Sequence, residues 1–337
     1  MEAYLWESAK NMTVKCNLCN HRCLIKEGQR GICGVRENKS GTLQTLVYGR
    51  LIAQNVDPIE KKPLFHFMPG TRSYSIATVG CNFKCQFCQN ADIAQMPSDR
   101  DGMIMGNHVP PEDIVAGARR TGCKSISYTY TEPTIFFEYA YDTAKLAHQE
   151  RIRNVFVTNG YMTPEALKMI SPYLDAANVD LKAFNPDYYK NFCSAKLEPV
   201  KETLKMMKSL GIFVEVTTLI IPDLNDGKEE LTALARFIVD SLGSDTPWHV
   251  SRFHPTYKMT DRPSTPVQTL ISARRIGLDA GLRYVYTGNV PGEQGENTFC
   301  YQCGKVLIER WGYQISNYQI EGGSCKFCGA PIDGVDL

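Results

Sequence analysis

Short apolar runs alternate with longer amphipathic stretches over the middle of the chain, from Ser73 to about Tyr286. The runs are rich in β-branched and aromatic residues, which is typical of strands, and most intervals are long enough for a helix. Strands that alternate with helices form a parallel sheet, either a full or partial barrel or an open doubly wound sheet. In both arrangements the functional groups gather at the carboxyl ends of the strands. The six predicted strands, and a short seventh, are residues 73–79, 125–130, 154–158, 177–181, 213–221, 248–253 and 283–286.

Two of the intervals carry signals for the start of a helix. Thr163 stands directly before a proline, as expected of an N-cap residue followed by proline in the first turn. Asp226 and Glu229 have the spacing of a capping box. An apolar stripe at helix spacing follows them, at Leu231, Leu234, Phe237 and Ile238.

The segments on either side of this region are rich in cysteine and glycine instead. Within the first segment, residues 24–34 are predicted to form a loop and residues 43–53 to form strands. The last segment has two cysteine pairs and little helical periodicity. We therefore predict three parts: an N-terminal four-cysteine metal-binding lobe over residues 1–72, a core barrel over 73–290, and a C-terminal zinc-ribbon-like module over 291–337.

The composition argues against several classes of protein. Hydrophobic residues make up 43% of the chain, as in ordinary globular proteins, and the net charge of +1 gives no strong attraction to nucleic acid or to an anionic membrane. No apolar run is long enough for a membrane helix. The first residues carry acids where a signal peptide would carry bases. We expect a cytoplasmic protein.

Thirteen cysteines in a chain of this length favour metal or redox chemistry over disulfides. Eleven of them fall into three tight clusters, as expected of metal ligands. The other two, Cys123 and Cys193, stand apart and are predicted to be buried, inert thiols.

The central cluster, Cys81, Cys85 and Cys88, follows directly after the first predicted strand. Three thiolates can hold three corners of a [4Fe–4S] cube and leave the fourth iron open for chemistry. The alternative is a zinc site with a distant fourth ligand. Zinc knuckles more commonly use pairs of cysteines two residues apart, so we favour the iron–sulfur cluster.

The two outer clusters each have four cysteines, enough to close a metal site. In the C-terminal set a glycine follows each pair, which favours a structural zinc ribbon over an auxiliary [4Fe–4S] cluster. That set is Cys300, Cys303, Cys325 and Cys328. The N-terminal set has less regular spacing, and for it we favour zinc over iron–sulfur, with both left open. That set is Cys16, Cys19, Cys23 and Cys33.

The Cys-x3-Cys-x2-Cys spacing, with Phe87 before the last cysteine, resembles the signature of the radical SAM superfamily. The resemblance implies an α/β fold, a partial (β/α)6 TIM-like barrel, whose open iron binds S-adenosylmethionine (SAM). One electron from the cluster then cleaves SAM, and a 5′-deoxyadenosyl radical abstracts hydrogen from a substrate. It also implies an electron donor of the flavodoxin or ferredoxin kind.

Two strand ends resemble SAM-binding motifs of such enzymes. Glu132, in Thr-Tyr-Thr-Glu-Pro, takes the place of a Gly-Gly-Glu-Pro element that binds the SAM amino group, with Tyr130 and Thr131 in place of the glycines. A solvated loop acid is the alternative for Glu132. The next strand end resembles the Thr-Asn-Gly of glycyl-radical activating enzymes, although Val157 replaces an Asp that could serve a cation site. These residues are Thr158, Asn159 and Gly160.

The fourth strand ends in Asp180-Leu181-Lys182, which matches the Asp-Leu-Lys of the same enzymes. Asp180 and Lys182 alternate with Leu181, so both are expected to face the barrel mouth, unless they form a purely structural ion pair. Later strand ends supply candidate substrate contacts, of which the histidine is equally expected to be structural. These candidates are Arg252, His254, Tyr286 and Asn289.

The chain as a whole resembles the AmmeMemoRadiSam-system radical SAM proteins, often labelled pyruvate formate-lyase activating enzyme homologues. The resemblance rests on Cys-Asn-Leu-Cys-Asn-His-Arg-Cys, on Arg-Gly-Ile-Cys-Gly-Val-Arg-Glu-Asn, on the runs from Glu60 to Gly70 and from Cys81 to Asn90, and on the final ribbon. It implies AMMECR-like and Memo-like proteins as partners.

We expect an enzyme that abstracts hydrogen from a macromolecule. The alternatives are a metal-stapled scaffold that binds protein or RNA, and radical modification of a small molecule or tRNA.

Overall fold

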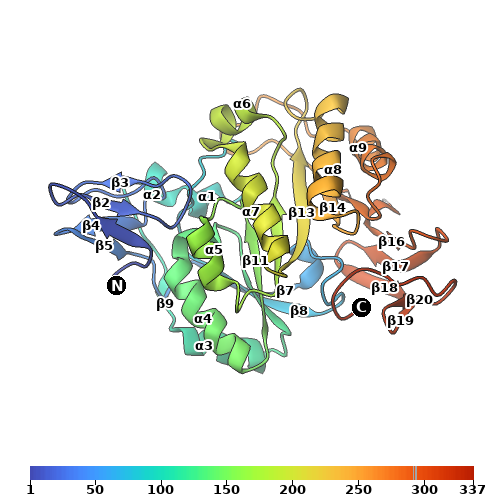
Figure 1. Cartoon of the computed structure of the whole chain (residues 1–337), viewed down its shortest axis with the longest axis horizontal. Helices are drawn as coiled ribbons and strands as arrows, with labels where there is room; N and C mark the ends of the chain where they lie inside the picture. The colour runs from blue at the N-terminus through green and yellow to red at the C-terminus, as the bar shows by residue number, and fades with distance from the viewer. Residues whose placement is uncertain (291, 293) are drawn as a thin grey trace.

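An eight-stranded sheet forms the centre of the computed structural model, which describes residues 1–290, 292 and 294–337 (Figure 1). Seven of its strands are parallel, and β7 pairs antiparallel with β8. Since β7 and β15 end the strand order, the sheet is a partial barrel, which confirms the predicted fold class. In spatial order the strands are β15 (Val285–Gly288), β14 (Trp248–Arg252), β13 (Phe213–Ile220), β12 (Ala176–Asp180), β11 (Arg153–Thr158), β10 (Ser125–Tyr128), β8 (Arg72–Ala77) and β7 (Ala53–Pro58).

Helices follow the parallel strands, and in Figure 1 the longer ones lie in front of the sheet. The predicted apolar stripe of α8 is buried, with all four side chains at most 9% exposed. No helix among the described residues combines the length and apolar character needed to cross a membrane. The helices are α1 (Ala91–Ala94), α2 (Met96–Asp99), α3 (Pro111–Arg120), α4 (Phe137–Gln149), α5 (Pro164–Ile170), α6 (Pro186–Tyr188), α7 (Leu197–Ser209), α8 (Lys228–Leu242) and α9 (Val267–Asp279), with the short turns η1 (Ile59–Lys61), η2 (Pro133–Phe136), η3 (Tyr189–Cys193) and η4 (Gln294–Glu296).

One of the two predicted helix caps is present. The Thr163 hydroxyl accepts the Ala166 N–H at 3.2 Å and begins α5. The predicted capping box at Asp226 is wrong, because α8 begins after Gly227 without a side-chain cap. Asp226 instead accepts the Asp223 N–H in the preceding turn, so its carboxylate serves the loop and not the helix.

The N-terminal lobe consists of short antiparallel strands and loops beside the barrel (Figure 1). The buried Arg36 pairs with Glu138 of α4, and the Tyr4 N–H donates to the same carboxylate at 2.7 Å, which fixes the lobe to the barrel. Strand β7 lies within predicted residues 1–72 but belongs to the barrel sheet. The strands of this lobe outside the barrel sheet are β1 (Trp6–Ser8), β2 (Val14–Cys16), β3 (Leu24–Ile25), β4 (Arg36–Lys39), β5 (Thr42–Thr45) and β6 (Arg50–Leu51), which pairs with β9 (Asn107–His108).

The C-terminal module lies across the barrel from the N-terminal lobe in Figure 1. Its start was predicted at Pro291, which lies outside the described residues. Arg310 donates to the Phe65 carbonyl at 2.8 Å, and the His66 ring bonds the Asp333 carbonyl at 2.6 Å, so the module packs on the run that follows β7. Its strands are β16 (Thr298–Phe299), β17 (Val306–Trp311), β18 (Gln314–Tyr318), β19 (Ile320–Glu321) and β20 (Ser324–Cys325).

Candidate active site

A cavity of about 1120 Å³ lies at the carboxyl ends of the parallel strands. This is the end of the sheet where an α/β barrel assembles its site. Gly160 and Tyr286 are not among the described residues that line it. The other predicted residues of the central site do line it: Cys81, Cys85, Phe87, Cys88, Glu132, Thr158, Asn159, Asp180, Lys182, Arg252, His254 and Asn289.

The cysteine loop between β8 and α1 is held from outside the barrel by the turn η3. The N–H groups of Lys84 and Gln86 donate to the carbonyls of Cys193 and Phe192, at 2.9 and 3.0 Å. Burial is the main cause that raises the pKa of the Cys81 thiol well above its ordinary value. A metal must therefore displace protons from this loop when it binds.

Glu132 is buried, with 2% of its surface exposed, so it is not a solvated loop acid. Its carboxylate accepts from the N–H and hydroxyl of Thr134 at 3.0 and 2.5 Å, from the Thr158 hydroxyl at 2.7 Å, and from the Asn159 N–H at 2.8 Å. Burial raises its pKa, and these hydrogen bonds oppose the rise. The carboxylate thus joins the ends of β10 and β11 into one rigid wall of the cavity.

Asn159 connects that wall to the cysteine loop. Its side-chain N–H donates to the Asn82 side-chain oxygen at 2.7 Å and lies 3.9 Å from the Cys81 sulfur. Gly160 follows with a φ of +68°, and a Cβ there would lie 2.8 Å from the Val179 side chain. Glycine at this position lets the loop turn tightly against β12.

Asp180 and Lys182 form an ion pair at the end of β12, with 3.0 Å between the lysine nitrogen and the carboxylate. The lysine nitrogen also lies 5.8 Å from the centre of the Phe87 ring. Burial lowers the pKa of Lys182, but Asp180 and the nearby Cys85 thiol outweigh it, and the pKa is raised. Lys182 therefore stays protonated beside the cysteine loop, with Asp180 as its counter-ion.

The four predicted substrate residues have different surroundings in the structure. Arg252 donates to the Thr265 carbonyl at 2.8 Å, and Asn289 donates to the Ser251 hydroxyl at 3.0 Å. His254 is exposed at the rim. Tyr286 is buried between the barrel and the C-terminal module, because side chains alternate along β15 and Thr287 takes the cavity side.

The sequence analysis missed a buried cluster on the cavity wall formed by Lys62, Asp57 and Tyr130. Lys62 and Tyr130 both bond one oxygen of Asp57, at 2.6 and 2.5 Å, and both line the cavity. Burial lowers the pKa of Lys62 to about 8, although Asp57 opposes this. Lys62 lies in the run from Glu60 to Gly70, and Tyr130 was noted only as a replacement for a glycine near Glu132, so the sequence gave neither residue a role.

The C-terminal four-cysteine set forms a compact group. The sulfur atoms of Cys300 and Cys328 are 3.6 Å apart, those of Cys303 and Cys325 are 3.8 Å apart, and all four lie within 4.8 Å of one another. A tetrahedral zinc with Zn–S bonds of about 2.3 Å separates its sulfurs by about 3.8 Å. The spacing matches that of a closed zinc site.

The comparisons with known proteins agree with this architecture. The model of the radical SAM superfamily matches residues 75–238. An uncharacterized protein of Methanocaldococcus jannaschii, MJ0808, is 49% identical over 334 residues, which are 98% of each chain. The pyruvate formate-lyase-activating enzyme of Clostridium pasteurianum is 23% identical over 176 residues, covering 50% of this chain and 70% of that enzyme.

Two solved structures share the fold. A radical SAM methyltransferase from Sphaerobacter thermophilus has a TM-score of 0.52 at 17% identity and covers 71% of each chain. Streptococcus suis SuiB bound to precursor peptide SuiA has a TM-score of 0.52 at 14% identity, over 69% of this chain and 52% of SuiB. This chain belongs to the radical SAM superfamily. Membership implies a [4Fe–4S] cluster and SAM as cofactors.

Proposed function

We propose that this protein is a SAM-cleaving radical enzyme that abstracts hydrogen from a protein or another large substrate. The observation that carries the proposal is the cavity at the strand ends, where the three-cysteine loop meets Glu132, Asn159 and the Asp180–Lys182 pair. Reactive groups from four successive strand ends converge there, as radical chemistry on a bound cofactor requires.

The residues of the loop fit a [4Fe–4S] cluster held by Cys81, Cys85 and Cys88. Among residues 1–290, 292 and 294–337, no three ligand atoms of this loop lie within 4.8 Å of one another, so the thiols are too far apart for a single zinc ion. When bound, the reduced cluster supplies the electron that cleaves SAM. The chain's own part is to hold the strand ends through Glu132, to keep Lys182 charged beside the thiolates, and to shield the site from water.

The size of the cavity supports a large substrate. A drug-sized ligand occupies a pocket of about 300–1,000 Å³, and this cavity of about 1120 Å³ leaves room beyond a cofactor of SAM's size. Among the relatives, the name of the pyruvate formate-lyase-activating enzyme gives a protein as its target. A polypeptide segment that enters the cavity is the substrate class we favour.

The proposal also includes partners and a structural metal. We propose a low-potential one-electron donor of the flavodoxin or ferredoxin kind, and AMMECR-like and Memo-like proteins as binding partners. We further propose zinc in the C-terminal module, on the sulfur spacing described above. Binding of purified partner proteins, measured by calorimetry, tests the second of these.

The test is anaerobic reconstitution with iron and sulfide, followed by addition of dithionite and SAM. Wild-type protein should yield 5′-deoxyadenosine and methionine, and the variant with Cys81, Cys85 and Cys88 all changed to Ala should yield none. Cys123→Ala is the matched control, because this buried thiol lies outside the three clusters and its loss should leave the yield unchanged. Equal yields from the triple variant and the wild type would falsify the proposal.

A further inference from the structure

We infer that the N-terminal set, Cys16, Cys19, Cys23 and Cys33, holds an iron–sulfur cluster rather than zinc, and that this cluster lies directly beside the Cys81 loop. The sequence spacing favoured zinc at this set and left an iron–sulfur cluster open. The chain would then have a second redox centre, which is separate from the proposed SAM-cleaving cluster and lies where it can serve it.

The distances between sulfur atoms within each set divide the three cysteine sets into two kinds. Among the described residues, only the C-terminal set brings three or more sulfurs within 4.8 Å of one another, as zinc requires. The N-terminal sulfurs do not meet this condition, and neither do those of the Cys81 loop, whose superfamily binds an iron–sulfur cluster. An iron–sulfur cluster puts several atoms between its thiolates and so holds them farther apart than one ion does. The N-terminal set therefore shares with the central cysteines a spacing too wide for a single zinc ion, unlike the ribbon.

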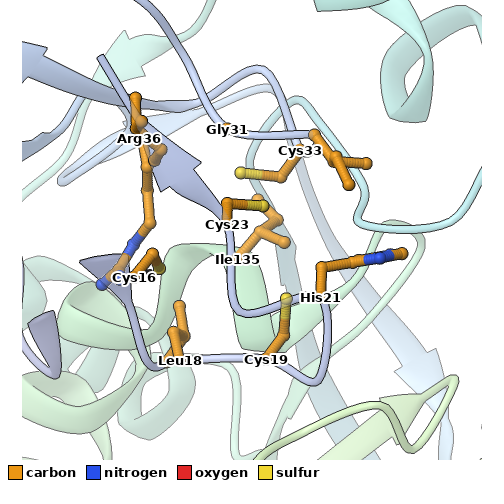
Figure 2. Close-up of a pocket in the computed structure, with 11 residues that line it drawn as sticks. Cys16, Leu18, Cys19, His21, Cys23, Gly31, Cys33, Arg36 and Ile135 are labelled. Carbon is orange, nitrogen blue, oxygen red and sulfur yellow. Dashed lines mark hydrogen bonds between the residues drawn. The ribbon is translucent and has the colours of Figure 1, made fainter. Parts of the chain in front are cut away.

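The four N-terminal cysteines also surround a void. They line one small pocket, which admits a water-sized sphere, together with Leu18, Ile25, Ile32 and Ile135 (Figure 2). A tetrahedron of sulfurs around a single zinc leaves no such space at its centre. The apolar neighbours would exclude water from a bound cluster, which protects it and tunes its potential.

One buried cation faces the pocket. Arg36, which lines the pocket in Figure 2, is 1% exposed and donates to the Cys16 sulfur at 3.1 Å. Its other terminal nitrogen pairs with Glu138. A cluster with four thiolates is anionic, and a guanidinium that donates to one of its sulfurs stabilises the reduced form. Zinc with four thiolates is anionic too, so Arg36 supports a thiolate site in general, and the spacing decides which metal it holds.

The N-terminal set lies against the loop of the central cluster. The His21 ring, which lines the N-terminal pocket, donates to the carbonyl of Asn82, the residue after Cys81, at 2.8 Å. Gly80 has a φ of +104°, and a Cβ there would lie 3.2 Å from the Cys33 carbonyl and 2.6 Å from the Val35 side chain. Ile135 reaches the same pocket from η2, whose N-cap is Glu132. The two cysteine loops thus lie directly against each other.

A redox centre at this position has one evident use. On the proposed function, the central site must receive one electron per SAM cleaved, and the N-terminal cluster can pass on one electron that it has taken from an external one-electron donor. The transfer leaves the N-terminal cluster oxidised again, so electrons balance over one cycle. The path is short, since His21 and Asn82 join the two loops by a single hydrogen bond.

Metal analysis of anaerobically purified full-length protein tests the metal assignment without using activity. The variant with Cys81, Cys85 and Cys88 changed to Ala should still hold iron and sulfide, four irons per chain for a [4Fe–4S] cluster or two for a [2Fe–2S] cluster, plus one zinc. An iron-free triple variant with two zincs would overturn the inference and leave the proposed function standing. Wild-type protein that holds the central iron but forms no 5′-deoxyadenosine would overturn the proposed function and leave this inference standing.

A matched pair of variants shows which cysteines hold which metal. Cys16→Ala with Cys19→Ala should lose the N-terminal iron and keep the zinc, whereas Cys300→Ala with Cys303→Ala should lose the zinc and keep all the iron. The opposite pattern overturns the inference. In dithionite-reduced wild type, electron paramagnetic resonance should show two clusters coupled to each other. A spectrum that equals the sum of the two single-cluster variants contradicts their placement side by side.

Discussion

At the scale of single residues, Glu132 shows how burial changes the meaning of a motif. The sequence presented it as an acid in a loop, available to a cofactor. In the structure its carboxylate already accepts four hydrogen bonds from Thr134, Thr158 and Asn159. Its first task is therefore to fix two strand ends, and any contact with SAM uses a geometry that these bonds have set in advance.

Glu132→Gln tests this role. The Asn159 N–H now donates to a carboxylate oxygen of Glu132, and the glutamine amide would place an N–H group there instead. Because two donors would then face each other, the variant should lose about 1–3 kcal/mol of unfolding free energy. The SAM-dependent yield should fall as well. Urea unfolding measures the first effect and product analysis the second.

Glu165→Gln is the control for Glu132→Gln. The Glu165 side chain is exposed and its partner Arg22 is half-buried, so the loss of this surface ion pair should change the unfolding free energy by no more than about 0.5 kcal/mol. Equal stability of the two variants would show that the Glu132 bonds contribute little.

At the scale of elements, the loops after the parallel strands are shaped by close packing against neighbouring strands. The loop after β11 turns at Gly160, whose left-handed backbone lies against Val179 of β12 and Val200 of α7. This contact determines where Asn159 points and hence how the wall meets Cys81. Gly160 contributes to the site through the backbone, without lining the cavity.

Gly160→Ala should destabilise the protein by about 1–3 kcal/mol more than Gly211→Ala. Both glycines have a positive φ, of +68° and +77°, so both substitutions carry the backbone strain of a side chain in that region. Only Gly160 would also force a Cβ to within 2.8 Å of another atom, while Gly211 has open space around it. Thermal unfolding of the two variants gives the difference, and a difference near zero would mean that the loop moves aside freely.

At the scale of the whole molecule, buried polar contacts fasten the outer parts to the barrel. On one side Arg36 pairs with Glu138. On the other, the His66 ring donates to the Asp333 carbonyl at 2.6 Å and bonds the Tyr286 hydroxyl at 2.5 Å. Burial is the main cause that lowers the pKa of His66 from its usual 6.5 to about 4, although Glu215 opposes it.

The His66 contact predicts an acid-sensitive junction. A pKa that is lower in the folded than in the unfolded protein gives stability that is present above pH 6.5 and is lost as the pH falls through about 4. A shift of this size corresponds to about 3 kcal/mol. His66→Gln should flatten the dependence of unfolding free energy on pH between 6.5 and 4, and His254→Gln, at an exposed position, should not. A wild-type profile that is flat in this range would contradict the prediction.

Much of this fold follows from local patterns. The hydrophobic pattern located the seven parallel strands to within a few residues. A strand buried on both faces is a short, nearly continuous apolar run, which differs from the 3.6-residue period of the helices between the strands. The strand-end motifs located the cavity lining because parallel strands bring their carboxyl ends together at one edge of the sheet. The capping box at Asp226 failed because a turn competed for the same carboxylate.

The sequence by itself determined the alternation of strands and helices, the three cysteine sets and the position of the site, because these depend on residue type and short-range spacing. Only the tertiary structure decided that Glu132 is buried, that Tyr286 faces away from the cavity, and that Lys62 and Tyr130 join its wall. It also decided that the four C-terminal sulfurs lie within 4.8 Å of one another and that Gly80, just before Cys81, lies against Cys33 and Val35. These properties depend on residues distant in the chain, such as Cys33 against Gly80, and no local pattern records such contacts.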